Sequence, residues 1–507
     1  MSTLVSFLWH MHQPFYKDLA RGKYVMPWTY LHATKDYLGM PALLEEFPQV
    51  HQTFNLVPSL IVQIEEYARG EARDELFDLA FKPVDALTPA DRTTICEQFF
   101  PVPVRTMVSP YPRYIELYER RQRGETFTDA ELRDIQVWWT LAWIDFDRQP
   151  RGLIEKGRDF SEDDKANLHR FAVQLIRSVS AEYKKMQQRG SIEISVSPFY
   201  HPILPLLINS RVDDPGMPVD VRFPDDAREQ LVRAQKFMNA KFGREPVGLW
   251  PSEGSVSDDV AALAASLGFR WLATDEGILA KSGVGNRQNR PYERHGVKLF
   301  FRDRGISDLI GFHYMHSPPR QAAEDLIRRL KEFGDGAHVS IALDGENPWD
   351  YYPKSGRDFL RHLYDGIQND SALEAVTFVE ACERVQSERL DWLAPGSWAG
   401  ANFSIWAGHA EDHEAWRWIV RSREALMANK DAPQWELAYE ELLIAEGSDW
   451  MWWFGNDFSS DQDAVFDALF RHHIGNVYRF AGLPLPDDLS NPIKKNLEGR
   501  RLVMPPP

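Results

Sequence analysis

Cysteine is scarce in this sequence. Its 507 residues include only two, Cys96 and Cys382, and their separation matches no metal-ligand spacing. This scarcity predicts a reducing compartment and argues against a disulfide framework. No apolar run approaches the ~18–20 residues that a membrane span needs, and the first residues lack the basic and apolar pattern of a signal peptide. We therefore expect a cytoplasmic protein with no membrane partner.

Net positive charge and phosphate-binding loops are also absent. The formal net charge is -17 at pH 7, which argues against nucleic acid or an anionic membrane as a partner. No Gly-rich phosphate loop, internal repeat or low-complexity segment occurs. Aromatic residues, by contrast, make up 12% of the chain and include 17 Trp. This composition is typical of a globular protein, and the tryptophan surplus also fits stacking against sugar rings.

Strand-like and helical segments alternate over most of residues 1–388. Strand patterns, apolar in some segments and alternating in others, occur at residues 4–9, 51–56, 191–196, 247–250, 269–274, 297–302, 339–343 and 374–378. The alternation indicates a parallel α/β fold, and about seven strands favour a barrel over an open sheet. Only helical patterns occur from about residue 60 to 188, which predicts a helical insertion in the barrel. Residues 389–507 are helical again, which predicts a C-terminal helical bundle.

The stretch from Val339 to Tyr352 combines a strand with acidic and aromatic residues. The strand ends at Asp344, and Glu346 and Trp349 follow after a Gly. In α/β barrels, catalytic groups lie at the carboxyl ends of the strands. Acidic groups beside aromatic rings suit a neutral, hydroxyl-rich ligand such as a sugar. A turn with solvated acids is the alternative interpretation of this stretch alone.

Polar side chains also occur at or near the ends of other predicted strands. His10, His12 and Gln13 follow the first strand, although hydrogen bonds to neighbouring residues would explain a His-X-His loop as well. Glu193 lies in an alternating strand, where a solvated face is the usual explanation. In a closed barrel it would instead point to the interior or the mouth and need partners. Glu253 lies between a strand and a helix, and helix capping is its alternative role.

A further stretch of unusual composition lies in the predicted C-terminal bundle. Residues 445–455 contain a Gly-Ser-Asp break followed by Trp450, Trp452 and Trp453. So many rings beside such a break are unusual for a plain helix core. We therefore expect this stretch to form a wall of the site.

Five stretches in order resemble the motifs of glycoside hydrolase family 57, which acts mainly on α-glucans. They are His12-Gln13-Pro14, Gly190-Ser191-Ile192-Glu193-Ile194, Gly248-Leu249-Trp250-Pro251-Ser252-Glu253, Asp344-Gly345-Glu346 and the stretch from Ala445 to Gly455. The resemblance implies an incomplete seven-stranded (β/α) barrel with a helical insertion. It also implies a C-terminal helical domain that contributes the fifth motif. The first and fourth motifs resemble amylopullulanase-like or α-amylase-like members, whereas branching enzymes of the family have a different first motif.

The resemblance also implies roles for individual residues. Glu253 is expected to be the nucleophile and Asp344 the general acid/base of a retaining mechanism on α-1,4 or α-1,6 linkages, without a metal or organic cofactor. Two carboxyls about 5–5.5 Å apart suffice for such a double displacement. The residues expected to bind the substrate are His10, His12, Gln13, Glu193, Trp250, Glu346, Trp349, Asp449 and Trp453.

Three other functions stay open on the sequence. A 4-α-glucanotransferase or branching enzyme would use the same two carboxyls. A metal-dependent, mannosidase-like hydrolase would place zinc between His10, His12 and nearby acids, which a His-X-His pair at a strand end permits. A catalytically inactive glucan-binding protein would keep the rings without turnover.

Overall fold

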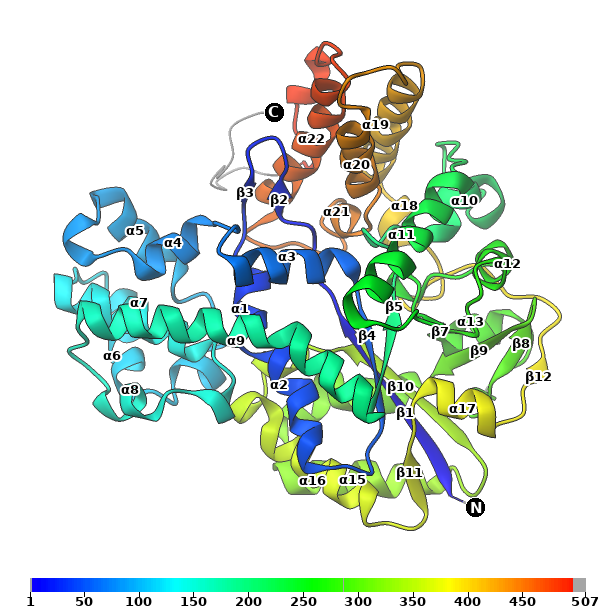
Figure 1. Cartoon of the computed structure of the whole chain (residues 1–507), viewed down its shortest axis with the longest axis horizontal. Coiled ribbons are helices and arrows are strands. Elements are labelled where there is room, and N and C mark those ends of the chain that lie inside the picture. Colours follow the sequence, from blue (N-terminus) through cyan, green and yellow to red (C-terminus); the bar gives the residue numbers. More distant parts are fainter. Residues whose placement is uncertain (1, 286, 496–507) are drawn as a thin grey trace.

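Seven parallel strands form a closed ring in the computed structural model, which describes residues 2–285 and 287–495 (Figure 1). Around the ring they are β1 Thr3–Met11, β4 Gln52–Leu56, β5 Ile192–Val196, β6 Gly248–Leu249, β7 Trp271–Asp275, β9 Val297–Arg302 and β10 His338–Asp344. A single pairing, Ser340 with Arg302, joins β10 to β9 and closes the ring. The seven-stranded (β/α) barrel predicted from the sequence is confirmed. Only one residue pair joins β9 to β10, so this is where the barrel is least tightly closed.

The register of β1 against β10 places polar residues at one edge of the barrel. β1 is buried along its whole length, so its apolar run could be recognised in the sequence. The two strands pair in parallel from Leu4 with His338 to His10 with Asp344. His10 and Asp344 therefore lie side by side at the carboxyl ends of their strands, the edge where α/β barrels place their catalytic groups.

Short strands extend the sheet outside the ring. The last predicted strand is β11, Leu373–Ala375, which pairs with the start of β1 instead of joining the ring. β8, Tyr292–Arg294, runs antiparallel to β9 and pairs with β12, Glu388–Arg389. These additions leave the carboxyl edge of the ring free for the site.

The chain between β4 and β5 is helical, as predicted, and lies on one side of the barrel (Figure 1). It contains α3 Pro58–Arg69, α4 Glu75–Phe81, α5 Pro89–Gln98, α6 Pro112–Gln122, α7 Asp129–Ala142, α8 Arg151–Lys156 and α9 Glu162–Arg189. A capping box of Thr128 and Glu131 starts α7. Neither α9, at 28 residues, nor any other helix within the described ranges is long and apolar enough to cross a membrane.

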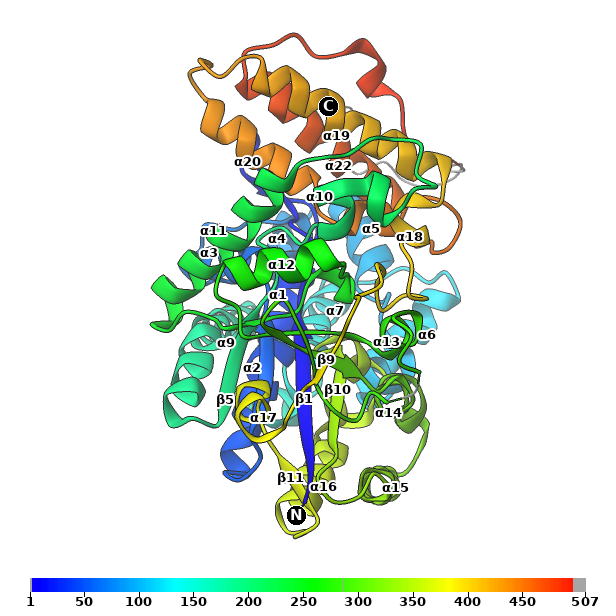
Figure 2. The same cartoon turned by 90° about the vertical axis from the view of Figure 1, so that its right-hand side faces the viewer.

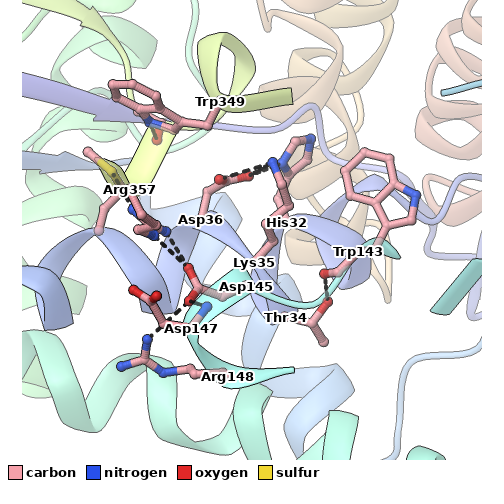
Figure 3. Close-up of polar contacts among 12 residues, drawn as sticks. His32, Thr34, Lys35, Asp36, Trp143, Asp145, Asp147, Arg148, Trp349 and Arg357 are labelled. Atoms are coloured by element: carbon pink, nitrogen blue, oxygen red, sulfur yellow. Dashed lines mark hydrogen bonds and ion pairs between the residues drawn. The ribbon is translucent and has the colours of Figure 1, made fainter. Parts of the chain in front are cut away.

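Buried ions join this insertion to the barrel (Figure 3). Arg357, which begins α16 (Arg357–Gln368), donates from Nε to Oδ2 of Asp145 at 2.9 Å, and both side chains are buried. Lys35 is also buried and its Nζ lies 2.6 Å from Oδ1 of Asp350. An unpaired buried charge is costly, so these pairs hold the insertion and the loop after β10 in fixed positions.

Three helices near the C-terminus pack on one another above the barrel in both views (Figures 1 and 2). They are α19 Ala410–Met427, α20 Trp435–Ala445 and α22 Asp463–Phe480, with the short α21 Asp449–Trp452 between them. The backbone N–H of Ser448 donates to the carbonyl of His201 at 2.9 Å, which brings α21 to the barrel edge. A domain boundary at residue 388 remains a prediction, and residues 496–507 lie outside the described residues.

Candidate active site

A cavity of about 610 Å³ lies at the carboxyl edge of the barrel, and both expected catalytic carboxyls, Glu253 and Asp344, line it. Other expected site residues in its wall are His10, His12, Gln13, Glu346, Asp449 and Trp453. The insertion contributes Trp139 and Trp143 to the same wall. The barrel, the insertion and the C-terminal helices thus all contribute side chains to one cavity. Some of these side chains are several hundred positions apart in the sequence.

Asp344 is the last residue of β10 and sits at the floor of this cavity. Its Oδ2 accepts a hydrogen bond from Nδ2 of Asn347 at 3.0 Å. Desolvation raises the pKa of Asp344 above its usual value, and the Asn347 hydrogen bond opposes this rise. Asp344 is therefore more readily protonated than a solvated aspartate, as a general acid requires.

Glu253 is held in an unusual backbone conformation. It lies in the turn Ser252–Gly254 after β6, with φ of 57° and ψ of 28°. A non-glycine residue in this left-handed region is strained by about 1 kcal/mol or more, and such strain is concentrated at functional sites. The turn aims the carboxyl into the cavity, where its Oε2 accepts a hydrogen bond from the indole Nε1 of Trp398 at 2.8 Å.

The charge of Asp344 affects the protonation of Glu253. Desolvation, reinforced by the charge of Asp344, raises the pKa of Glu253 to about 8, against the hydrogen bond from Trp398. A retaining glycosidase uses one ionised and one protonated carboxyl, but the pKa of Glu253, about 8, places a proton on Glu253 in the free protein, so the expected roles require Asp344 to hold the proton once substrate is bound.

Three histidine rings stack beside the carboxyls. The ring centroids of His12 and His201 are 3.9 Å apart, and those of His10 and His201 are 5.1 Å apart. Burial and the neighbouring His12 lower the pKa of His10 to about 3. Burial likewise lowers the pKa of His201 well below its usual value. Both rings are therefore neutral at pH 7 and offer hydrogen bonds without adding positive charge.

Side chains from distant segments orient these rings. Nδ1 of His10 lies 2.7 Å from Oδ1 of Asn55 on β4, and Nδ1 of His201 lies 3.0 Å from Oγ of Ser448. His12 Nε2 is 2.7 Å from Oδ1 of Asp449, the first residue of α21. The expected wall of the site formed by residues 445–455 thus reaches the cavity through its polar residues as well as through Trp453.

Glu346 is buried and only 2% exposed, yet it lines the cavity. Desolvation and the charge of Asp344 raise its pKa well above the usual value. Its Oε2 has no hydrogen-bond partner among the described residues. A neutral carboxyl with an unsatisfied oxygen at a cavity wall can donate to or accept from a ligand hydroxyl.

Three expected substrate-binding residues do not reach this cavity. Glu193 lies in the barrel interior, where its carboxylate accepts from Nε1 of Trp271 at 2.8 Å and Oγ1 of Thr53 at 3.0 Å. Trp250 is completely buried and packs against the ring of Trp398. Trp349 is also completely buried, with its ring on Trp9 and Tyr352. The prediction that these three side chains face the substrate disagrees with the structure, since internal partners already satisfy or enclose them.

Two site residues had no assigned role in the sequence analysis. His201 follows the strand β5 within Ser197-Pro198-Phe199-Tyr200-His201, and the same pattern of polar residues after a strand identified His10 and His12. Trp398 belongs to a loop without periodicity, so only the folded chain shows that it contacts Glu253.

The geometry of His12, His201 and Asp449 tests the alternative of a zinc-dependent hydrolase. Ligand atoms of His12, His201 and Asp449 lie within 4.8 Å of one another, so this group could hold a metal ion. However, the rings of His12 and His201 stack with an interplanar angle of 26°, and the nitrogen lone pairs lie in the ring planes. Because the two rings are stacked, their lone pairs lie in two nearly parallel planes and do not converge on one central ion. The arrangement fits hydrogen bonding between His12 and Asp449 better than tetrahedral coordination.

Curated relatives match only part of this chain. Alpha-amylase 1 of Dictyoglomus thermophilum is 26% identical over 170 residues, which are 32% of this chain and 22% of that protein. An alpha-amylase of Pyrococcus horikoshii is 22% identical over 227 residues, or 42% of this chain and 32% of that protein. The chain therefore covers less than a third of the length of either relative.

Solved structures share the fold over nearly the whole chain. A GH57-type branching enzyme from Pyrococcus horikoshii superposes with a TM-score of 0.64 at 15% identity, covering 95% of this chain and 90% of that one. The alpha-amylase AmyC from Thermotoga maritima gives 0.60 at 14% identity, covering 95% and 93%. The sequence profile of glycosyl hydrolase family 57 matches residues 6–393. Because that match covers well over half of the 507 residues, the chain belongs to glycosyl hydrolase family 57.

Proposed function

We propose that this protein is a retaining glycosidase that acts on α-glucans, with Glu253 as the nucleophile and Asp344 as the general acid/base. The observation that carries the proposal is that both desolvated carboxyls line one cavity at the carboxyl edge of a parallel barrel. Membership of family 57 and the curated α-amylases among the relatives support α-glucan as the substrate class.

The proposed reaction proceeds in two displacements. In the first, Asp344 gives its proton to the glycosidic oxygen while Glu253 attacks the anomeric carbon. The bond from that carbon to the leaving sugar breaks, and an ester between the sugar and Glu253 forms. In the second, Asp344 takes a proton from water, the water oxygen attacks the anomeric carbon, and the ester bond breaks. Each step inverts the anomeric carbon, so the product retains its configuration.

Neutral hydrogen-bonding groups around the pair suit an uncharged substrate. His10 and Glu346 line the cavity, and their shifted pKa values keep both uncharged near pH 7. His12 and Asp449 pair with each other and expose polar atoms to the same space. These groups can form hydrogen bonds with sugar hydroxyls. They add little charge of their own beside Glu253 and Asp344.

Aromatic rings in the cavity wall are fixed by other rings. Trp453 stacks on Phe466 with centroids 5.0 Å apart, and Trp452 stacks on Phe458 at 4.4 Å. Both tryptophans line the cavity and both are only partly buried. Rigid, partly exposed rings provide flat apolar surfaces for glucose rings at little entropic cost.

A second candidate function is transfer of the glycosyl group to another sugar. Leu343, Pro348 and Ala399 line the space next to Asp344. An apolar surface at that position favours a sugar acceptor over water. The reaction would use the same two carboxyls and the same glycosyl ester.

A product profile distinguishes the two candidates. The protein is incubated with maltoheptaose and the oligosaccharides are separated by chromatography, with Glu253→Gln as the inactive variant. Glu324→Gln is a matched control, because Glu324 is exposed on α15 (Pro319–Glu332) and lines neither the active-site cavity nor the space next to Asp344. Shorter products alone indicate hydrolysis, and a mixture of shorter and longer products indicates transfer. Unchanged maltoheptaose with the wild-type protein would contradict the proposal.

A further inference from the structure

A second cavity, of about 520 Å³, adjoins the first at Asp344. We infer that it binds the leaving-group end of an α-glucan chain, with Phe312 and Tyr351 as its stacking surfaces. This inference rests on the proposed function, because it assigns the direction in which a glucan crosses the two carboxyls.

The two cavities are continuous. Asp344, Asn347, Tyr351, Trp398 and Trp452 line both of them. A chain bound in the first cavity can therefore extend past Asp344 into the second without leaving the protein surface.

The positions of the two carboxyls set the direction of the chain. Glu253 lines only the first cavity, whereas Asp344 lines both. In a double displacement the nucleophile bonds to the sugar that stays on the protein, and the acid protonates the oxygen of the sugar that leaves. The retained sugar must therefore lie in the first cavity. The leaving sugar, on the far side of the Asp344 carboxyl, must lie in the second.

Exposed aromatic rings are concentrated at the second cavity. Phe312 is 65% exposed and Tyr351 is 53% exposed, and both line it. These are the two most exposed large aromatic side chains among the described residues. Rings so exposed are unfavourable in water unless a ligand covers them, and sugar rings bind to such surfaces.

Arg302 supplies an unsatisfied donor in the same cavity. Its side chain is mostly buried, the residue being 8% exposed, and its Nε has no hydrogen-bond partner among the described residues. Its Nη2 donates to Oδ1 of Asp308 at 2.8 Å, and the guanidinium lies 5.3 Å from the ring centre of Trp398. These contacts hold the guanidinium in the cavity wall beside Trp398.

The helical insertion holds two segments of this cavity together. Arg105 donates from Nη2 to the carbonyl of Tyr351 at 2.7 Å and to the carbonyl of Met315 at 3.2 Å. Tyr351 and Met315 both line the cavity, and they belong to different loops. The binding surface is therefore fixed before the ligand arrives, which lowers the entropic cost of binding.

The test compares two substrates that differ only in what leaves. Maltoheptaose places sugars on both sides of Asp344, whereas α-maltotriosyl fluoride releases fluoride and needs no contact with the second cavity. We expect Phe312→Ala to lower kcat/KM for maltoheptaose about 5- to 10-fold more than kcat/KM for the fluoride. Tyr351→Ala should change the ratio in the same direction. Trp392→Ala, which removes a 50% exposed ring outside both cavities, should leave the ratio unchanged.

The failures of the inference and of the proposed function give different results. A wild-type protein that turns over neither substrate contradicts the proposed function, and with it the inference. Active variants of Phe312 and Tyr351 with wild-type ratios contradict the inference alone. Since both side chains are more than half exposed, melting temperatures close to the wild-type value should accompany either result.

Discussion

Trp398 holds Glu253 at two points. Its indole Nε1 donates to Oε2 of the carboxyl at 2.8 Å, and its backbone N–H donates to the Glu253 carbonyl at 3.0 Å. The first bond stabilises the ionised carboxylate and opposes the rise in its pKa that desolvation causes. The second ties the left-handed turn to the loop that follows β12. One residue, through its backbone and its side chain, thus affects both the position and the charge of the proposed nucleophile.

Removing the indole donor should shift the pH dependence of activity. Trp398→Phe keeps a ring against Trp250 but loses the hydrogen bond to Glu253. The pKa of Glu253 should then rise further above about 8, so less of the nucleophile is ionised at pH 7. We expect the acidic limb of the kcat/KM profile to move about one pH unit toward alkaline values. A uniform loss at every pH would indicate a structural role only.

The raised pKa of Glu253 also predicts how stability changes with pH. A carboxyl with a pKa near 4.5 when unfolded and about 8 when folded stabilises the protein below pH 4.5, and this contribution is lost as pH rises through 8. Glu253→Gln mimics the protonated form. Its melting temperature should exceed that of the wild type by about 2 °C or more at pH 9, with the smallest difference near pH 4. A difference that is the same at both pH values, or that Glu324→Gln reproduces, would contradict this.

The buried pair of Arg357 and Asp145 should be essential for docking the insertion (Figure 3). Asp145→Asn leaves a buried guanidinium without its counter-charge, and urea unfolding should show a loss of about 3–5 kcal/mol. Arg357→Met combined with Asp145→Leu should recover much of that loss, because neither charge is then buried. Arg328→Met, at an exposed ion pair, is the control and should unfold like the wild type. A stable Asp145→Asn variant would contradict the docking role.

Chelation should leave activity on α-glucans unchanged. His12 and Asp449 already bond each other, and the rings of His12 and His201 stack with an interplanar angle of 26°. Dialysis against EDTA should therefore change the rate less than about twofold, a difference below ~0.4 kcal/mol. A large loss that zinc restores would favour the metal-dependent alternative instead.

The strands of the barrel could be predicted because they are buried. β1, β9 and β10 are rich in apolar residues, and the ends of β1 and β10 carry His10 and Asp344 to a common edge. The helical character of the insertion was equally visible, since capping boxes such as that of Thr128 occur within one turn. These features depend on local periodicity, which a single sequence contains.

The exposure of individual rings could not be predicted in the same way. Trp250 and Trp349 lie beside acidic motifs but are covered by Trp398 and Trp9, residues far away in the sequence. Glu193 likewise finds a buried partner in Trp271. Whether a side chain faces a ligand or the core depends on long-range packing, so composition near a motif is an unreliable guide to it.

Covalent trapping tests the central claim, that Glu253 is the nucleophile, most directly. The protein is treated with 5-fluoro-α-glucosyl fluoride, which forms a long-lived glycosyl ester, and its peptides are analysed by mass spectrometry. We predict one fluoroglucosyl group on Glu253 and none in the Glu253→Gln variant. A label on Glu346 or Asp449, or normal turnover of maltoheptaose by a folded Glu253→Gln variant, would contradict the assignment.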